Sequence, residues 1–319
     1  MAGPVTEIAV LGPGGVGGFV AAALARAGAS VTVVAREATA EAIARDGIAV
    51  DSARLGELHA RPRATTTLDE PVDVLVVAVK AAGLAAALDR VRTEPHLVVP
   101  MLNGLDHLEP LRERFGPRAV AASIRVESTR TAPTRIEQAS PFLLVELASG
   151  NPRMRGSIEA FARVLGEAGV PARVRESEAD VMWGKLVRLC ALALTTTAYD
   201  RPLGRIRSTP ELRDELVTAV REVAAVATAD GASVDPGRTL AELDDAHAEL
   251  DTSMHRDVTA GREPELDAIA GSVLRAAARH GVAIPTVERL AARAAERAGT
   301  APPGAASPAA PRPATAAPG

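Results

Sequence analysis

The chain has 319 residues, of which 47% are hydrophobic and 24% are charged, and its formal net charge is −4. This length is enough for two domains, and the composition is ordinary for a soluble protein. No basic block alternates with aromatic residues, so a nucleic-acid partner is not expected. No uninterrupted apolar run approaches the roughly 18 residues of a membrane span, and no signal-like segment opens the chain. We expect a cytoplasmic protein without a membrane partner.

The first third of the chain alternates predicted strands with predicted helices. Residues 6–36 predict a strand, a glycine turn, a helix and a second strand. Apolar runs at 72–80 and 95–104 have the length and composition of strands buried on both faces. A helix around 108–116 and a strand within 118–128 follow. This alternation predicts an α/β fold of the Rossmann type, with a doubly wound parallel sheet.

From about residue 178 onward, every apolar pattern has the period of a helix. The predicted helices lie at 178–200, 209–231, 239–253, 263–281 and 287–299. We therefore predict a Rossmann domain at 1–176 and an all-α C-terminal domain at 177–299. The last segment, 300–319, is rich in Pro and Ala with almost no charge, and we predict that it is disordered.

The turn "GPGGVG" has the G-x-G-x-x-G spacing of a dinucleotide-binding turn. Gly12 allows the tight turn, Gly14 lets a pyrophosphate approach the backbone, and Gly17 lets the helix pack close to the strand. Gly15 opens the predicted helix, whose N-terminus faces the phosphates. Because the turn follows a predicted strand and begins a helix, we predict that these four glycines bind a dinucleotide. A purely structural turn is the alternative.

The residue after the second strand indicates which dinucleotide binds. This position is Arg36, followed by Glu37. Arginine suits the 2′-phosphate of NADP, whereas a carboxylate suits the ribose hydroxyl of NAD. We predict NADP, with Arg36 as its ligand. In the alternative, Arg36 is a solvated loop residue and Glu37 binds the ribose.

Lysine is rare in this chain. Only Lys80 and Lys185 occur, and the other 34 of the 36 basic residues are arginine. Lysine can release its proton at accessible pH, whereas guanidinium is effectively always charged. The two lysines are therefore candidate site residues. The single cysteine, Cys190, is expected to be a small core residue. The six histidines are scattered without ligand spacing, so no metal site is predicted.

Five segments together resemble the ketopantoate reductase (2-dehydropantoate 2-reductase) family, and the likeness spans about residues 7–297. They are "AVLGPGGVGG", "VAVKAAGL", "LNGLDHLEPL", "MWGKLVRLC" and "TSMHRDVTAGREPELDAIAGSVLRAAARHGVAIP". The resemblance implies an NADP-binding Rossmann domain, a helical domain and a small 2-keto acid substrate in the cleft between them.

The same resemblance implies roles for individual residues. Lys185 matches the proton donor to the substrate carbonyl, and Lys80 matches a lysine that contacts the cofactor. Asn103 matches a residue at the nicotinamide end that also contacts substrate. Glu265 matches an acidic residue that completes the catalytic site, and Ser253 matches a substrate-binding serine.

Each of these roles has a simpler alternative. Lys185 could extend from its helix to solvent, as most lysines do. Glu265 could be favoured only because acids suit the first turn of a helix, and Ser253 could be a helix cap. Against the first alternative, an ammonium beside a carbonyl oxygen that gains charge both stabilises it and delivers a proton, which arginine does poorly.

The chain departs from the family where asparagines usually hold the substrate. Read without gaps from Lys185, those positions are Leu189, Ala193 and Leu203. Their loss favours a 2-keto acid with an apolar side chain. Arg188 or Arg256 could bind the substrate carboxylate, although both are equally consistent with surface charges. We predict Arg256 as a substrate ligand, because it lies in the segment that resembles the substrate loop of the family.

Three functions remain open at this point. The first is an NADPH-dependent reductase of a 2-keto acid, either 2-dehydropantoate or a relative. The second is a reductase of a bulkier or more apolar ketone or imine, and the third is a non-catalytic NADP-binding sensor. Helical domains of this kind often dimerise, so a homodimer is a further hypothesis.

Overall fold

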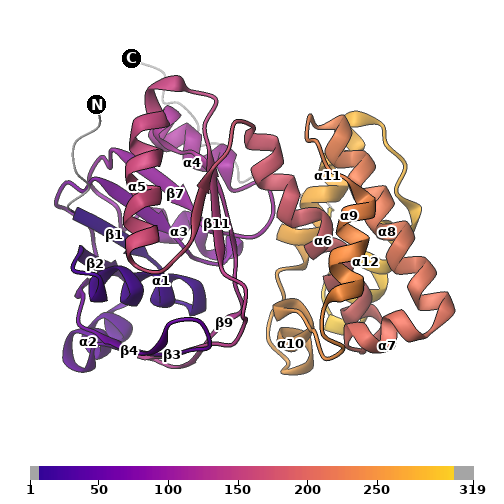
Figure 1. The fold of residues 1–319 in the computed structure, drawn as a ribbon, viewed down its shortest axis with the longest axis horizontal. Coiled ribbons are helices and arrows are strands. Elements are labelled where there is room, and N and C mark those ends of the chain that lie inside the picture. Colours follow the sequence, from indigo (N-terminus) through magenta and orange to yellow (C-terminus); the bar gives the residue numbers. More distant parts are fainter. Residues whose placement is uncertain (1–6, 305–319) are drawn as a thin grey trace, which may run out of the picture.

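The structure is a computed structural model that describes residues 7–304. Figure 1 shows an α/β half, which runs from β1 to β12, beside a half made only of helices. The predicted Rossmann fold with an all-α domain after it is confirmed. The prediction of disorder at 300–319 falls mostly on residues 305–319, which lie outside the described residues.

The main sheet has five parallel strands in the order β5-β2-β1-β6-β7. The strands are β1 (Glu7–Leu11), β2 (Ser30–Val34), β5 (Arg63–Thr65), β6 (Val74–Val77) and β7 (Leu97–Pro100). The helices that follow them are α1 (Gly15–Arg26), α2 (Glu37–Asp46), α3 (Leu84–Leu88) and α4 (Leu108–Phe115). From β1 the chain first adds β2 and β5 on one side of the sheet and then β6 and β7 on the other. Ligands of such sheets bind where this direction changes, at the carboxyl ends of the strands.

Both faces of this sheet are buried, which explains its continuous apolar strands. Along β1, Ile8 and Val10 face the core that contains Phe19 of α1. The alternate residue Leu11 faces a second core with Phe115 of α4. Because successive side chains of a strand point to opposite faces, a strand covered on both sides must be apolar throughout.

Two smaller sheets accompany the main sheet, and of their strands only the one within 118–128 was predicted from sequence; it lies in the three-stranded sheet and not in the parallel one. One has the order β4-β3-β10-β9, from β3 (Ile48–Ser52), β4 (Gly56–Ala60), β9 (Ser128–Ala132) and β10 (Arg135–Gln138). The other has the order β12-β11-β8, from β8 (Ala121–Arg125), β11 (Leu144–Ala148) and β12 (Ala172–Val174), with α5 (Arg155–Glu167) before β12. Several of these strands expose alternate residues, so they lack the apolar runs that mark the main sheet.

The helical half surrounds one long helix, α6 (Glu178–Tyr199). The others are α7 (Leu203–Ser208), α8 (Pro210–Ala229), α9 (Pro236–Asp245), α10 (Ser253–Thr259), a π-helical segment (Asp267–Gly271), α11 (Ser272–His280) and α12 (Pro285–Ala298). Helix α6 is apolar and long enough to span a membrane by length and composition alone. However, 78% of its apolar window is buried inside the protein, so α6 is a core helix.

The single helix predicted at 239–253 is wrong. Helix α9 ends at Asp245 and α10 begins at Ser253. Between them, the carbonyl of Leu250 accepts from the Leu203 N–H (2.9 Å) and that of Ala248 accepts from the Gly204 N–H (2.7 Å). The segment leaves the helical conformation because its backbone satisfies N–H groups at the start of α7, which have no partner within their own helix.

Helix α6 connects the two halves (Figure 1). It packs against α8 and α12 of the helical half and also against β8 and β11 of the α/β half. A second close contact lies at Gly104, in the loop after β7, where φ is +85°. A Cβ at this position would stand 2.0 Å from the carbonyl oxygen of Ala268 in the π-helical segment. The two halves therefore touch here through backbone.

We predict that Gly104→Ala lowers the free energy of unfolding by about 1–3 kcal/mol more than Gly28→Ala does. Both glycines have positive φ, but a Cβ at Gly28 meets nothing within 4 Å. The difference therefore isolates the clash with Ala268 from the cost of the backbone conformation. Urea denaturation of the two variants measures it, and equal losses would contradict the contact.

Candidate active site

The glycine turn leaves open backbone where a diphosphate would lie. Gly12 has a φ of +91°, and a Cβ at Gly17 would lie 2.1 Å from the Gly12 oxygen. A Cβ at Gly15 would lie 2.1 Å from the backbone oxygen of Ser128, whose hydroxyl donates to the Gly15 carbonyl at 2.8 Å. Only Gly14 of these four faces open space. Three glycines are thus required by the protein's own packing, and the fourth leaves room for a ligand.

Helix α1 begins at this open position. Its first turn, within the described part of the chain, has neither a side-chain cap nor an acidic residue. The free N–H groups and the positive end of the helix dipole therefore have no protein anion to satisfy them. This arrangement fits the phosphates of a dinucleotide, which agrees with the predicted role of the turn.

Arg36 and Lys80 follow two strands of the main sheet. Arg36 lies just beyond β2, where it precedes α2, and its side chain is exposed. Lys80 lies three residues after β6, and its ammonium donates to Asp257 Oδ2 at 2.8 Å and to the Glu263 carbonyl at 3.2 Å. The lysine that was predicted to contact the cofactor therefore also links the α/β half to the segment around α10.

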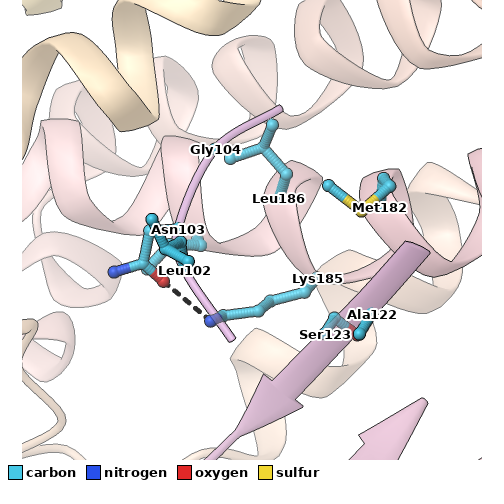
Figure 2. Close-up of a pocket in the computed structure, with 9 residues that line it drawn as sticks. Leu102, Asn103, Gly104, Ala122, Ser123, Met182, Lys185 and Leu186 are labelled. Carbon is cyan, nitrogen blue, oxygen red and sulfur yellow. Dashed lines mark hydrogen bonds between the residues drawn. The ribbon is translucent and has the colours of Figure 1, made fainter. Parts of the chain in front are cut away.

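The central feature of the site is a chain of hydrogen bonds across the two halves. The Lys185 ammonium of α6 donates to Asn103 Oδ1 at 2.7 Å, as Figure 2 shows. Asn103, three residues after β7, donates through Nδ2 to Glu265 Oε2 at 2.9 Å. The other oxygen of Glu265 accepts from the Ala81 N–H at 3.5 Å. The structure therefore brings together three predicted site residues that are far apart in sequence.

The pKa of Lys185 suits proton transfer near neutral pH. Burial lowers the pKa of Lys185 from its ordinary 10.5 to about 8, while the carboxylate of Glu265 raises it and the guanidiniums of Arg125 and Arg188 lower it further. Near neutral pH the amine is therefore mostly protonated and still able to release its proton. A general acid works best when its pKa lies near the working pH.

A small pocket adjoins the Lys185 side chain. Apolar groups line it, together with Ser123 of β8 (Figure 2). The full lining is Leu102, Asn103, Gly104, Ala122, Ser123, Met182, Lys185, Leu186 and Leu189. Of the three positions where the family usually has asparagine, only Leu189 reaches this pocket. Ala193 and Leu203 are fully buried in the core of the helical half.

The structure does not bring Ser253 and Arg256 into this network. Both side chains are exposed, and in residues 7–304 no hydrogen bond or ion pair joins either side chain to Lys185, Asn103 or Glu265. The N-terminal cap of α10 is Thr252, whose hydroxyl accepts from the His255 N–H at 3.2 Å. Ser253 is therefore not the cap, and substrate binding by Ser253 and Arg256 stays a prediction.

Sequence reasoning passed over two polar residues near the lysine. His107 is buried, and burial together with the charge of Lys185 lowers the pKa of His107 to about 4, so its imidazole is neutral. Ser123 is also buried, and its hydroxyl has no hydrogen-bond partner among the described residues. His107 lies within the segment "LNGLDHLEPL", but that resemblance gave it no role, and for Ser123 a serine in an apolar strand was the only signal. Cys190 is buried as expected, which raises its pKa to about 12.

Comparison with known proteins agrees with this architecture. The family description "Ketopantoate reductase PanE/ApbA" matches residues 8–146, and "Ketopantoate reductase PanE/ApbA C terminal" matches residues 179–298. A 2-dehydropantoate 2-reductase of Caulobacter vibrioides is 31% identical over 291 residues, which cover 88% of this chain and 95% of that protein.

Solved structures show the same likeness. A 2-dehydropantoate 2-reductase from Geobacter metallireducens GS-15 matches with a TM-score of 0.84 and 27% identity, over 91% of this chain and 99% of that one. A ternary structure of D-mandelate dehydrogenase with NADH and anilino(oxo)acetate has a TM-score of 0.82 at 20% identity, over 92% and 99% of the two chains, which is a likeness of fold.

The fold and the site define an oxidoreductase that combines a Rossmann domain with a helical domain. Within that class, the chain belongs to the ketopantoate reductase family.

We predict that Lys185→Met raises the free energy of unfolding at pH 7 by about 1–3 kcal/mol. The loss of the hydrogen bond to Asn103 offsets part of this gain. The folded pKa of about 8 lies below the ordinary 10.5, so the folded state binds this proton less tightly than the unfolded state does. The resulting penalty is complete below pH 8, shrinks between pH 8 and 10.5, and disappears above.

Thermal unfolding of the variant and the wild type across this pH range measures the effect. The difference in Tm should fall as the pH rises from 8 to 10.5. As a control, Lys80→Met removes an exposed ion pair, which is worth only about 0–1 kcal/mol. A Lys185→Met variant that is less stable than wild type at pH 7 would contradict the prediction.

Proposed function

We propose that this protein is an NADPH-dependent reductase that converts the carbonyl of a 2-keto acid into the hydroxyl of a 2-hydroxy acid. The observation that carries this proposal is the chain from Lys185 through Asn103 to Glu265, at the edge of the sheet where the glycine turn also lies. In this chain Lys185 is the proton donor, Asn103 orients its ammonium, and Glu265 keeps that ammonium charged.

The residues present fit a nicotinamide dinucleotide. The open backbone at Gly14 and the uncapped start of α1 would hold the diphosphate, together with the neighbouring glycines. Arg36 would bind the 2′-phosphate that distinguishes NADP from NAD, with Lys80 and Asn103 as further cofactor ligands. When bound, the reduced nicotinamide supplies the hydride.

The protein's own groups manage the charge that develops on the substrate oxygen. The ammonium of Lys185 stabilises that negative charge and then delivers its proton. Asn103 accepts from the ammonium and so fixes its direction. Glu265, whose charge raises the pKa of Lys185, counteracts burial and keeps the amine protonated before the reaction.

The pocket indicates the kind of substrate. Leu102, Met182, Leu186 and Leu189 line it with apolar surface beside the lysine, which favours a 2-keto acid with an apolar side chain. The matched relatives are named for 2-dehydropantoate, and the D-mandelate dehydrogenase of similar fold is named for an aromatic 2-hydroxy acid. We therefore propose 2-dehydropantoate or a more apolar relative as the substrate.

A panel of carbonyl compounds tests the proposal by NADPH oxidation. Turnover of 2-keto acids, including 2-dehydropantoate, supports it. Turnover only of bulky ketones or imines would favour the second hypothesis, which the apolar lining around Leu189 also suits. Tight NADPH binding with no turnover of any member would mean that the protein is a sensor and not a reductase.

We predict that Lys185→Ala lowers kcat by about 10²–10⁴, the usual effect of removing a positioned general acid. NADPH affinity should stay within about 2-fold of wild type, since this residue is not assigned to the diphosphate or the ribose. In the wild type, kcat/KM should fall as the pH rises through about 8, where Lys185 of the free enzyme loses its proton. An unaltered kcat in the variant would remove Lys185 from the chemistry.

We predict that Arg36→Ala weakens NADPH binding by about 10- to 100-fold and NADH binding much less, because a guanidinium pairs with the 2′-phosphate that NADH lacks. Fluorescence titration with each cofactor measures both constants. The matched variant Glu37→Ala should have the smaller effect on NADPH. Equal losses for the two cofactors would overturn the assignment of Arg36.

A further inference from the structure

Among the residues that the structure describes, the guanidinium of Arg188 forms no ion pair with a carboxylate. Arg188 lies on α6 three residues after Lys185, so the two side chains are neighbours on the helix surface. Its side chain is partly buried, and its guanidinium carbon stands 5.7 Å from the centre of the Phe142 ring. Among residues 7–304 it makes no hydrogen bond and no ion pair. An arginine taken out of water normally pairs with a carboxylate, so an unpaired one indicates a missing anion.

A second guanidinium lies beside it. Arg125 of β8 donates from Nη2 to the carbonyl of Gly184 at 3.0 Å, one helical turn before Arg188. Burial, followed by the positive charge of Arg125, lowers the pKa of Arg188, so the two like charges are close enough to interact. Such a pair destabilises the folded protein unless an anion lies between or beside them.

Two buried donors in the same place lack partners. The Ser123 hydroxyl and the Arg125 Nε–H are both buried and without a hydrogen-bond partner in the described residues. Their residues alternate along β8 and therefore share one face of the strand. Ser123 lines the pocket together with Lys185. A buried donor without a partner costs free energy, so these donors await a ligand rather than serve the fold.

Two carboxylates form long ion pairs with Arg125, but neither makes a hydrogen bond with it, and neither pairs with Arg188. Glu242 stands 3.7 Å from Arg125 Nη1, and its other oxygen lies 3.4 Å from Arg238. Glu146 stands 3.9 Å from Arg125 Nη2 and is shared with Arg175 at 3.6 Å. Both distances to Arg125 exceed hydrogen-bond length. Glu242 also offsets part of the charge of Arg188, as Glu127 does, but neither lies within ion-pair distance of it.

We propose that Arg188, with Arg125 and Ser123 beside it, binds the carboxylate of the substrate, and this inference rests on the proposed reduction of a 2-keto acid. In such a substrate the carbonyl and the carboxylate are on adjacent carbons. Lys185 and Arg188 are neighbours on one helix. The ammonium of Lys185 therefore contacts the carbonyl oxygen, while the guanidinium of Arg188 binds the carboxylate. This subsite takes the place of the amide group that the chain lacks at Leu189, the one of the three family positions that reaches the pocket.

The assignment also links binding to catalysis. The charges of Arg125 and Arg188 both lower the pKa of Lys185. A bound carboxylate neutralises part of that positive charge and therefore raises the pKa of Lys185. The lysine thus becomes more fully protonated when an acidic substrate binds.

The test compares a 2-keto acid with its primary amide, which has the same carbonyl and side chain but no charge. Wild type should have a KM for the acid about 10- to 100-fold below that for the amide. Arg188→Met should remove most of this preference by raising the KM of the acid, with the KM of the amide and the Kd of NADPH changed by less than about 2-fold. Ser123→Ala should lower the preference less. Arg221→Met, an exposed arginine on α8, is the control and should change neither KM.

Three results would overturn the subsite. One is a wild type that uses acid and amide equally well, which needs no folded variant. Another is an Arg188→Met variant that affects acid and amide alike, as a merely structural role would. The third is a loss of preference in Arg256→Met but not in Arg188→Met, which would place the carboxylate at α10. If wild type reduces neither compound, nor any other 2-keto acid, the proposed function itself fails instead.

Discussion

The hydrogen bond between Lys185 and Asn103 is the interaction on which the rest of the site depends. This bond spans the boundary between the α/β half and the helical half. Its acceptor, Asn103, uses both ends of its side-chain amide. The amide oxygen faces the ammonium of Lys185, and the amide nitrogen faces the carboxylate of Glu265. Because an amide accepts at one end and donates at the other, opposite charges on its two sides fix its orientation. The position of the amine then follows from that of the amide.

This arrangement is costly to the fold. A partly buried amine beside two guanidiniums has lost hydration that a single carboxylate, Glu265, only partly replaces. Core residues around it, such as Met182 and Leu186, would pack as well against an apolar side chain. Proteins commonly retain such unfavourable groups where activity requires them. The same requirement explains why this chain, in which lysine is rare, keeps one here. Arginine serves wherever only charge is needed.

The main sheet and the central residues were predictable from sequence because their signals are local or compositional. Buried parallel strands have continuous apolar runs, and Lys185 and Asn103 belong to residue types that the chain otherwise almost lacks. Apart from β8, the smaller sheets were not predicted, since several of their strands are partly exposed and the pairing of β10 with β3 joins residues far apart in the chain. Nor was the break before α10, which depends on a tertiary contact with Gly204. The positions of Arg125 and Arg188 likewise depend on how β8 meets α6, which no local pattern encodes.

Helix α6 has a mechanical consequence because it belongs to both halves. Near its start, Val181 and Met182 pack against Ala121 and Ala148 of the three-stranded sheet. Its later turns form the centre of the helical bundle. Any rotation of one half relative to the other must therefore pivot near this helix. Displacement grows with distance from a pivot, so the amine on α6 would move little. The peripheral ion pair between Lys80 and Asp257 is part of neither core, and it would be stretched or broken by the same swing.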